Sequence, residues 1–111
     1  KDPDPRGMQV IDPYGDIAGT VRELWVDGPE MMFRFLDVEL ADGSRRALVP
    51  ITFCRITHDA VYVHALLAHQ WREVPVTRSA DSITLLEEEK IAAYFGAGLL
   101  FAEPKRTEPL V

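Results

Sequence analysis

The chain has 111 residues, of which 47% are hydrophobic and 27% are charged, and these values are typical of one globular domain rather than a disordered chain. The net charge of −6 disfavours binding to nucleic-acid phosphates or to anionic lipid headgroups. The single cysteine, Cys54, excludes an internal disulfide, and no apolar run approaches the roughly 18 residues of a membrane-spanning helix. The chain begins at Lys1 with a proline-rich stretch, so residues 1–7 are interpreted as the remnant of a linker in an excised or processed chain.

Short segments rich in β-branched and aromatic residues follow this start, and residues 8–76 are expected to hold the strands of one domain. We expect short strands at 8–11, 20–27, 32–40, 46–49, 53–56 and 60–63. A turn is predicted over 27–30, and Asp42-Gly43 is the strongest hairpin signal in the chain. Strands recurring at about ten-residue spacing indicate a small barrel or sandwich.

The end of the chain changes character to a helical pattern. Thr84 followed by Glu87 is a capping-box pattern, and acidic residues in the first turn suit the helix dipole. A helix is therefore predicted over 84–98, ended or loosened by Gly96 and Gly98, with a polar tail over 104–111. The predicted fold class is mainly β, with antiparallel strands and a C-terminal α-helix.

Two stretches carry a resemblance to a known family. The first comprises Ile17-Ala18-Gly19-Thr20-Val21, Leu24-Trp25-Val26-Asp27, Pro29-Glu30 and Arg34-Phe35-Leu36. The second comprises Ile83-Thr84-Leu85-Leu86-Glu87-Glu88-Glu89-Lys90-Ile91, Ala93-Tyr94, Ala97-Gly98-Leu99-Leu100 and Ala102-Glu103-Pro104-Lys105-Arg106. Both are similar to the carboxy-terminal domain of the H subunits of purple-bacterial photosynthetic reaction centres, a branch of the PRC-barrel family. The resemblance runs from about Asp4 to Arg106, and the second stretch makes it specific.

The resemblance implies a single PRC-type antiparallel β-barrel domain over 1–111 with a C-terminal helix. It implies a subunit that is not an enzyme, caps the cytoplasmic side of the L and M subunits and assists proton transfer to the secondary quinone during light-driven electron transport. The domain would bind no cofactor itself, whereas the parent complex would hold bacteriochlorophyll, bacteriopheophytin, quinones and iron. Its place would be the cytoplasmic face of the bacterial inner (photosynthetic) membrane, reached through a missing N-terminal anchor and the partner subunits, while this fragment is expected to be soluble.

The sharpest cluster of charged residues comprises Asp27, Glu30 and Arg34, which flank the predicted turn. From the residues alone, this cluster is read as a solvated turn with a surface ion pair. The resemblance implies that the three residues belong to an acidic cluster that carries protons toward the secondary quinone. It also implies that Glu88, at the solvated start of the helix, joins a surface charge network.

Other reactive side chains give weaker signals. Cys54 lies in an apolar strand without a neighbouring base, so an inert thiol is expected. The spacing of His58, His64 and His69 fits no usual zinc pattern, and no metal site is expected.

Two readings stay open at this point. Trp25 and Phe35 could pack in the core or form part of an aromatic contact patch. The main alternative function is a free-standing soluble PRC-barrel binding or adaptor module, and a small hydrolase has no assembled site in its favour.

Overall fold

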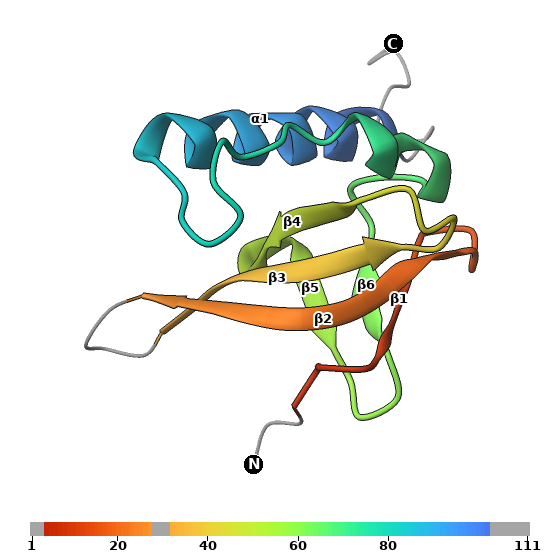
Figure 1. The fold of residues 1–111 in the computed structure, drawn as a ribbon. Helices are drawn as coiled ribbons and strands as arrows, with labels where there is room; N and C mark the ends of the chain where they lie inside the picture. The colour runs from red at the N-terminus through yellow and green to blue at the C-terminus, as the bar shows by residue number, and fades with distance from the viewer. Residues whose placement is uncertain (1–3, 28–31, 103–111) are drawn as a thin grey trace, which may run out of the picture.

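The computed structural model describes residues 4–27 and 32–102, without the side chains of 27, 32, 33 and 99–102. Within these residues, six strands form one sheet in the order β4-β3-β2-β1-β6-β5 (Figure 1). The strands are β1 (Gln9–Ile11), β2 (Ile17–Asp27), β3 (Met32–Leu40), β4 (Arg46–Pro50), β5 (Cys54–Ile56) and β6 (Val61–Val63). Neighbouring strands run antiparallel except for β1 and β6, which pair in parallel. The predicted mainly β class with one C-terminal helix is confirmed.

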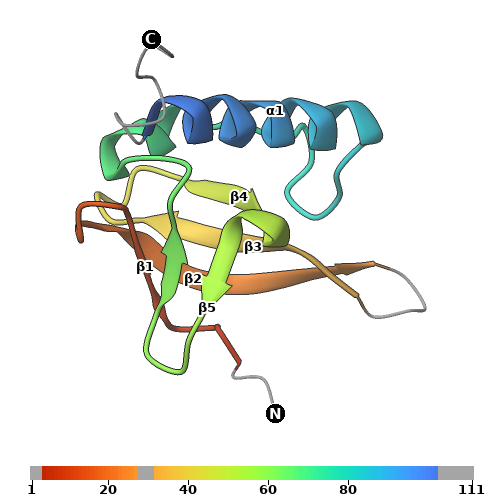
Figure 2. The same cartoon turned by 180° about the vertical axis from the view of Figure 1, so that it is seen from behind.

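The sheet is strongly bent, so that β5 and β6 cross behind β2 and β3 (Figures 1 and 2). A short 3-10 helix, η1 (Ile51–Phe53), connects the two edge strands β4 and β5. Among the described residues no strand pairing joins β4 to β5, so the barrel is not closed by hydrogen bonds. Pro50 fits this arrangement because a residue without an N–H group is tolerated at a sheet edge.

The long β2–β3 hairpin owes its curvature to two irregularities in the register of its strands. They fall between Val21 and Glu23 and between Trp25 and Val26, and an extra residue at such a point increases the local twist. Gly19 allows a close approach in this hairpin, since a Cβ atom there would collide with the backbone oxygen of Glu39. The following turn uses Gly43 with φ of 73°, which confirms the Asp42-Gly43 hairpin signal.

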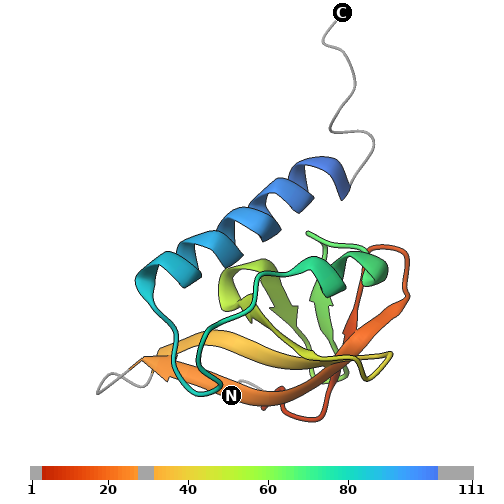
Figure 3. The ribbon, with the colours of Figure 1, turned by 45° about the horizontal axis from the view of Figure 1, so that its top comes forward.

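The core lies inside the bent sheet and continues up to the helix α1 (Leu85–Ala102), which lies across the upper side of the sheet (Figure 3). The sheet contributes a set of fully buried valine and leucine side chains, namely Val10, Val21, Leu36, Val38, Val49, Val61 and Val63. Helix α1 adds Ile91 and Phe95, both buried. The Phe95 ring stacks on Phe53 at 5.7 Å and meets Trp71 edge-on at 5.3 Å, so the helix is part of the core.

The helix start follows the prediction and its end does not. Thr84 Oγ1 accepts a hydrogen bond from the backbone N–H of Glu87, and Glu87 accepts one from the Thr84 N–H, which confirms the capping box. The helix continues past the predicted end at 98 to Ala102. Gly98 does not interrupt it, because the missing side chain lets the helix lie directly against Ala65 and Leu66.

Two further segments differ from the sequence-based interpretation. The strands end at Val63, and a 3-10 helix, η2 (Ala68–Glu73), occupies part of the region expected to hold strands. The described part of the predicted linker, residues 4–7, is attached to the sheet: Pro5 is buried, and the Gly7 N–H donates to the Val21 carbonyl oxygen at 2.8 Å. The predicted tail, 104–111, lies outside the described residues.

Candidate functional site

Two of the predicted proton-transfer residues, Asp27 and Arg34, lie toward the far end of the β2–β3 hairpin. Asp27 is the last residue of β2 and is paired in register with Met32. Glu30, the predicted turn and the side chain of Asp27 lie outside the described residues. Of the three residues, the structure therefore places only the Arg34 side chain, on β3.

Arg34 connects the hairpin to helix α1. Its Nη2 atom lies 2.8 Å from Oε1 of Glu88, across 54 residues of sequence. The Arg34 side chain is 42% exposed and that of Glu88 is 23% exposed. The sequence-based interpretation named both residues, but only the folded chain brings them together.

A small pocket opens beside this ion pair. It has a volume of about 210 Å³ and is lined by Arg34, Phe35, Pro50, Ile51, Thr52, Glu88 and Ala92. The Arg34 guanidinium also lies 6.0 Å from the centre of the Phe35 ring. The site therefore combines a permanent positive charge, a carboxylate and an apolar wall. An arginine does not release its proton in proteins, so only carboxylates in this region can carry one.

Two aromatic side chains of the hairpin, Trp25 and Phe35, contact the core. Phe35 is buried, and Trp25 is half-buried against the hydrophobic cluster. Phe35 therefore packs in the core, whereas the half-buried Trp25 keeps part of its ring at the surface. The side chain of Phe33 lies outside the described residues.

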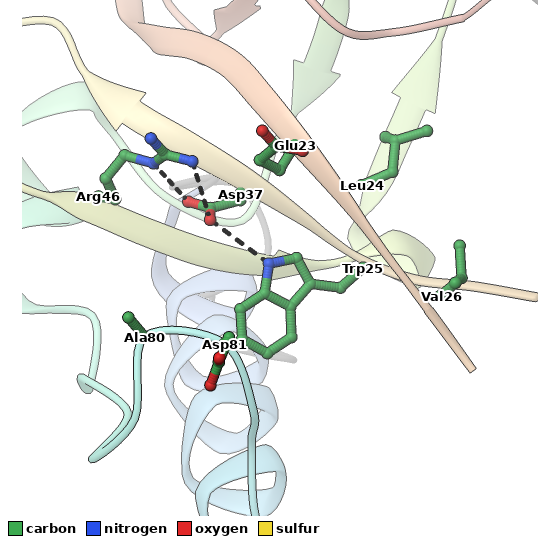
Figure 4. Close-up of a pocket in the computed structure, with 8 residues that line it drawn as sticks. All are labelled: Glu23, Leu24, Trp25, Val26, Asp37, Arg46, Ala80 and Asp81. Atoms are coloured by element: carbon green, nitrogen blue, oxygen red, sulfur yellow. Dashed lines mark hydrogen bonds and ion pairs between the residues drawn. The ribbon is translucent and has the colours of Figure 1, made fainter. Parts of the chain in front are cut away.

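A buried carboxylate on this face was not singled out from the sequence. Asp37 is 8% exposed and accepts hydrogen bonds from Nε and Nη2 of Arg46 at 3.0 and 3.2 Å. The indole N–H of Trp25 also donates to it, at 3.4 Å (Figure 4). An acidic residue in a strand otherwise rich in apolar residues was the available signal.

Asp12 is a second buried carboxylate that sequence reasoning missed. Its two oxygens accept hydrogen bonds from the backbone N–H groups of Tyr14, Asp16 and Ala68 at 2.8–2.9 Å. It therefore ties the β1–β2 turn to the start of η2. The stretch Asp12-Pro13-Tyr14-Gly15 carries the composition of an Asx turn, which could have revealed the first two bonds.

The remaining reactive side chains form no assembled site among the described residues. Burial raises the pKa of the Cys54 thiol to about 12, and the thiol donates to the Pro50 carbonyl oxygen at 3.6 Å. The predicted reading of Cys54 as an unreactive thiol agrees with this environment. His58, His64 and His69 are exposed, and no group of at least three potential metal ligands gathers within the part of the chain that the structure describes.

Membrane association was expected only through other segments or partner subunits. Within residues 4–27 and 32–102, no helix has both the length and the apolar character needed to cross a bilayer.

The bent sheet and the β2–β3 hairpin lie in the part of the chain that matches a known domain. The family model described as the PRC-barrel domain matches residues 1–70. These residues include all six described strands and the first part of η2. The match covers more than half of the 111 residues, and the chain therefore belongs to the PRC-barrel domain family.

Proposed function

We propose that this chain is the cytoplasmic domain of the H subunit of a purple-bacterial photosynthetic reaction centre. In this role it stabilises the L and M subunits and assists proton transfer to the secondary quinone. It is not an enzyme and binds no cofactor of its own. The pigments, quinones and iron belong to the parent complex, at the cytoplasmic face of the photosynthetic membrane.

The observation that carries the proposal is the second stretch of the resemblance, from Ile83 to Arg106. This stretch lies beyond the residues matched by the general PRC-barrel model, 1–70. Most of its described part forms α1, which supplies Ile91 and Phe95 to the core. The feature that resembles H subunits is thus an integral part of this fold.

The charge arrangement gives the proposed proton route a physical basis. Reduction places negative charge on a buried quinone, and that charge is costly until protons arrive. Asp27, Glu30 and Glu88 can take up and release protons, whereas Arg34 holds a fixed positive charge beside Glu88.

Two experiments test the two parts of the role. For assembly, the purified chain is mixed with reaction-centre L and M subunits stripped of their H subunit, and we expect a stable complex on size-exclusion chromatography. Absence of a complex would favour the free-standing adaptor.

For proton delivery, Glu30→Gln is introduced into a complete reaction centre that carries this domain. An amide cannot carry a proton, so flash-induced transfer of the second electron to the secondary quinone should become slower at neutral and alkaline pH. Glu89→Gln is the matched control, because Glu89 is exposed and forms no ion pair among the described residues. An unchanged rate in Glu30→Gln would leave the domain with an assembly role only.

A further inference from the structure

One pocket lies on the face of β2 and β3 that carries Trp25 and Asp37, and its lining includes neither Arg34 nor Glu88. It has a volume of about 370 Å³. Its walls come from the two strands, from Arg46 at the start of β4, and from Ala80 and Asp81 in the segment before α1 (Figure 4).

The Trp25 indole is held in a fixed orientation at this pocket. Its N–H donates to Asp37, and Asp37 also accepts hydrogen bonds from two nitrogen atoms of Arg46. Asp37 and Arg46 satisfy each other's charge, so neither is available as the main recognition group for a ligand. Their effect is to present the half-buried indole as a rigid aromatic surface lining the pocket.

Two other carboxylates line the same pocket with unused hydrogen-bonding capacity. Within the described residues, Glu23 takes part in no hydrogen bond or ion pair. Asp81 uses its Oδ1 atom to accept from the Ser79 hydroxyl at 2.8 Å, which leaves Oδ2 without a partner in the described chain. Both residues are exposed. The lining carries three carboxylates, those of Glu23, Asp37 and Asp81, against the one guanidinium of Arg46, whose charge acts on Glu23 as well as on Asp37.

We propose that this pocket receives an arginine side chain of a partner protein. A planar guanidinium can lie against the Trp25 ring and donate to the Asp81 carboxylate beside it, while Glu23 adds negative charge at the other end of the pocket (Figure 4). Arginine suits this combination better than lysine, because it joins stacking on an aromatic ring with several fixed donors. The overall charge of −6 would also steer a basic partner toward the surface.

This contact is independent of the proposed proton route. It uses neither Arg34 nor Glu88, and it requires no reaction-centre subunit for its test. Its success or failure therefore leaves the proposed function to be decided by its own experiments.

The test uses the whole chain labelled with ¹⁵N and three capped tripeptides, in which glycine flanks arginine, lysine or citrulline. Citrulline keeps the shape of arginine but carries no charge. The indole N–H signal of Trp25 reports binding, and that of Trp71, which is fully buried, serves as an internal reference for the fold. We expect the arginine peptide to shift the Trp25 signal saturably, with affinity on the order of millimolar for one side chain.

Variants of the pocket identify the groups responsible. Glu23→Gln combined with Asp81→Asn should weaken binding of the arginine peptide by about threefold to tenfold, while the Trp71 signal stays in place. Glu89→Gln, on α1 outside the pocket, should bind as the unmodified chain does. Equal binding of the citrulline or lysine peptide, absence of saturation, or full binding by the double variant would each overturn the proposal.

Discussion

The guanidinium of Arg34 on β3 and the carboxylate of Glu88 on α1 form an ion pair with a separation of 2.8 Å. The pair joins the β2–β3 hairpin to a helix that begins at Leu85, whereas β3 ends at Leu40. It is the point at which the predicted charge cluster and the C-terminal helix meet.

The ion pair should contribute little to stability. Since both side chains are partly exposed, we expect Glu88→Gln to lower the free energy of unfolding by less than about 1 kcal/mol. Urea denaturation of the isolated chain measures the change, and Glu89→Gln provides the control for loss of one helix carboxylate. A loss well above this range would mean that the pair holds the helix in place.

The buried carboxylate of Asp12 should matter far more. In Asp12→Asn one carboxylate oxygen becomes an NH₂ group, which cannot accept from the backbone N–H groups that converge on it. We expect a loss of about 1–3 kcal/mol in the free energy of unfolding, the usual effect of an unsatisfied buried group. Asp16→Asn is the matched control, because the Asp16 side chain is exposed and engages no partner among the described residues. Equal denaturation midpoints for the two variants would contradict this role.

The contribution of Glu87 should depend on pH. Backbone hydrogen bonds from Thr84 and Arg78 lower the pKa of Glu87 below its ordinary value of 4.5. A carboxyl with a lowered pKa in the folded state stabilises the fold above its unfolded pKa, and this contribution is lost as the pH falls through the folded value.

Unfolding measurements at pH 7 and near pH 3 should show this effect as a difference between the chain and its Glu87→Gln variant. The glutamine keeps one acceptor oxygen and loses the other, so the variant should be less stable at pH 7. The difference should shrink at the lower pH. A difference that stays constant would assign the effect to side-chain packing instead of charge.

The two helix glycines should respond in opposite directions to alanine. A Cβ atom at Gly98 would collide with Leu66 and with the backbone of Ala65, whereas one at Gly96 would meet nothing within 4 Å. Gly98→Ala should therefore cost about 1–3 kcal/mol through overpacking, and Gly96→Ala should stabilise the helix by up to about 1 kcal/mol. Thermal melting monitored by circular dichroism distinguishes the two, and a stable Gly98→Ala would show that the helix can shift without cost.

Local signals in the sequence predicted the local parts of this fold. Segments rich in β-branched and aromatic residues located β2 and β3, although β2 begins at Ile17 and not at 20, and the Thr84–Glu87 pair located the start of α1. The predicted end of α1 was wrong because glycine usually weakens a helix. The packing of Gly98 against Ala65 explains why this helix continues. A tertiary contact decided what local preference could not.

Contacts between segments that are distant in the sequence could not be predicted from it. No spacing rule relates Arg34 to Glu88 or Asp12 to Ala68, since each pair forms only after the helix and η2 are in place. The parallel pairing of β1 with β6 was likewise unforeseen, because neither three-residue strand carries a signal for its partner. The roles assigned to Asp27 and Glu30 stay predictions.

The strand β1 has only three residues, but its position in the sheet makes it necessary for the whole fold. In the strand order, β1 is the one element hydrogen-bonded to both β2 and β6. The described sheet therefore consists of two parts, β2–β3–β4 and β5–β6, which β1 connects. The β2–β3–β4 part can form from segments that are neighbours in the sequence, whereas the β1–β6 pairing requires residues around Val10 and Val61 to meet. Closing the long loop between Val10 and Val61 costs conformational entropy and is therefore slow. Assembly of the whole sheet must wait until Val61 can pair with β1.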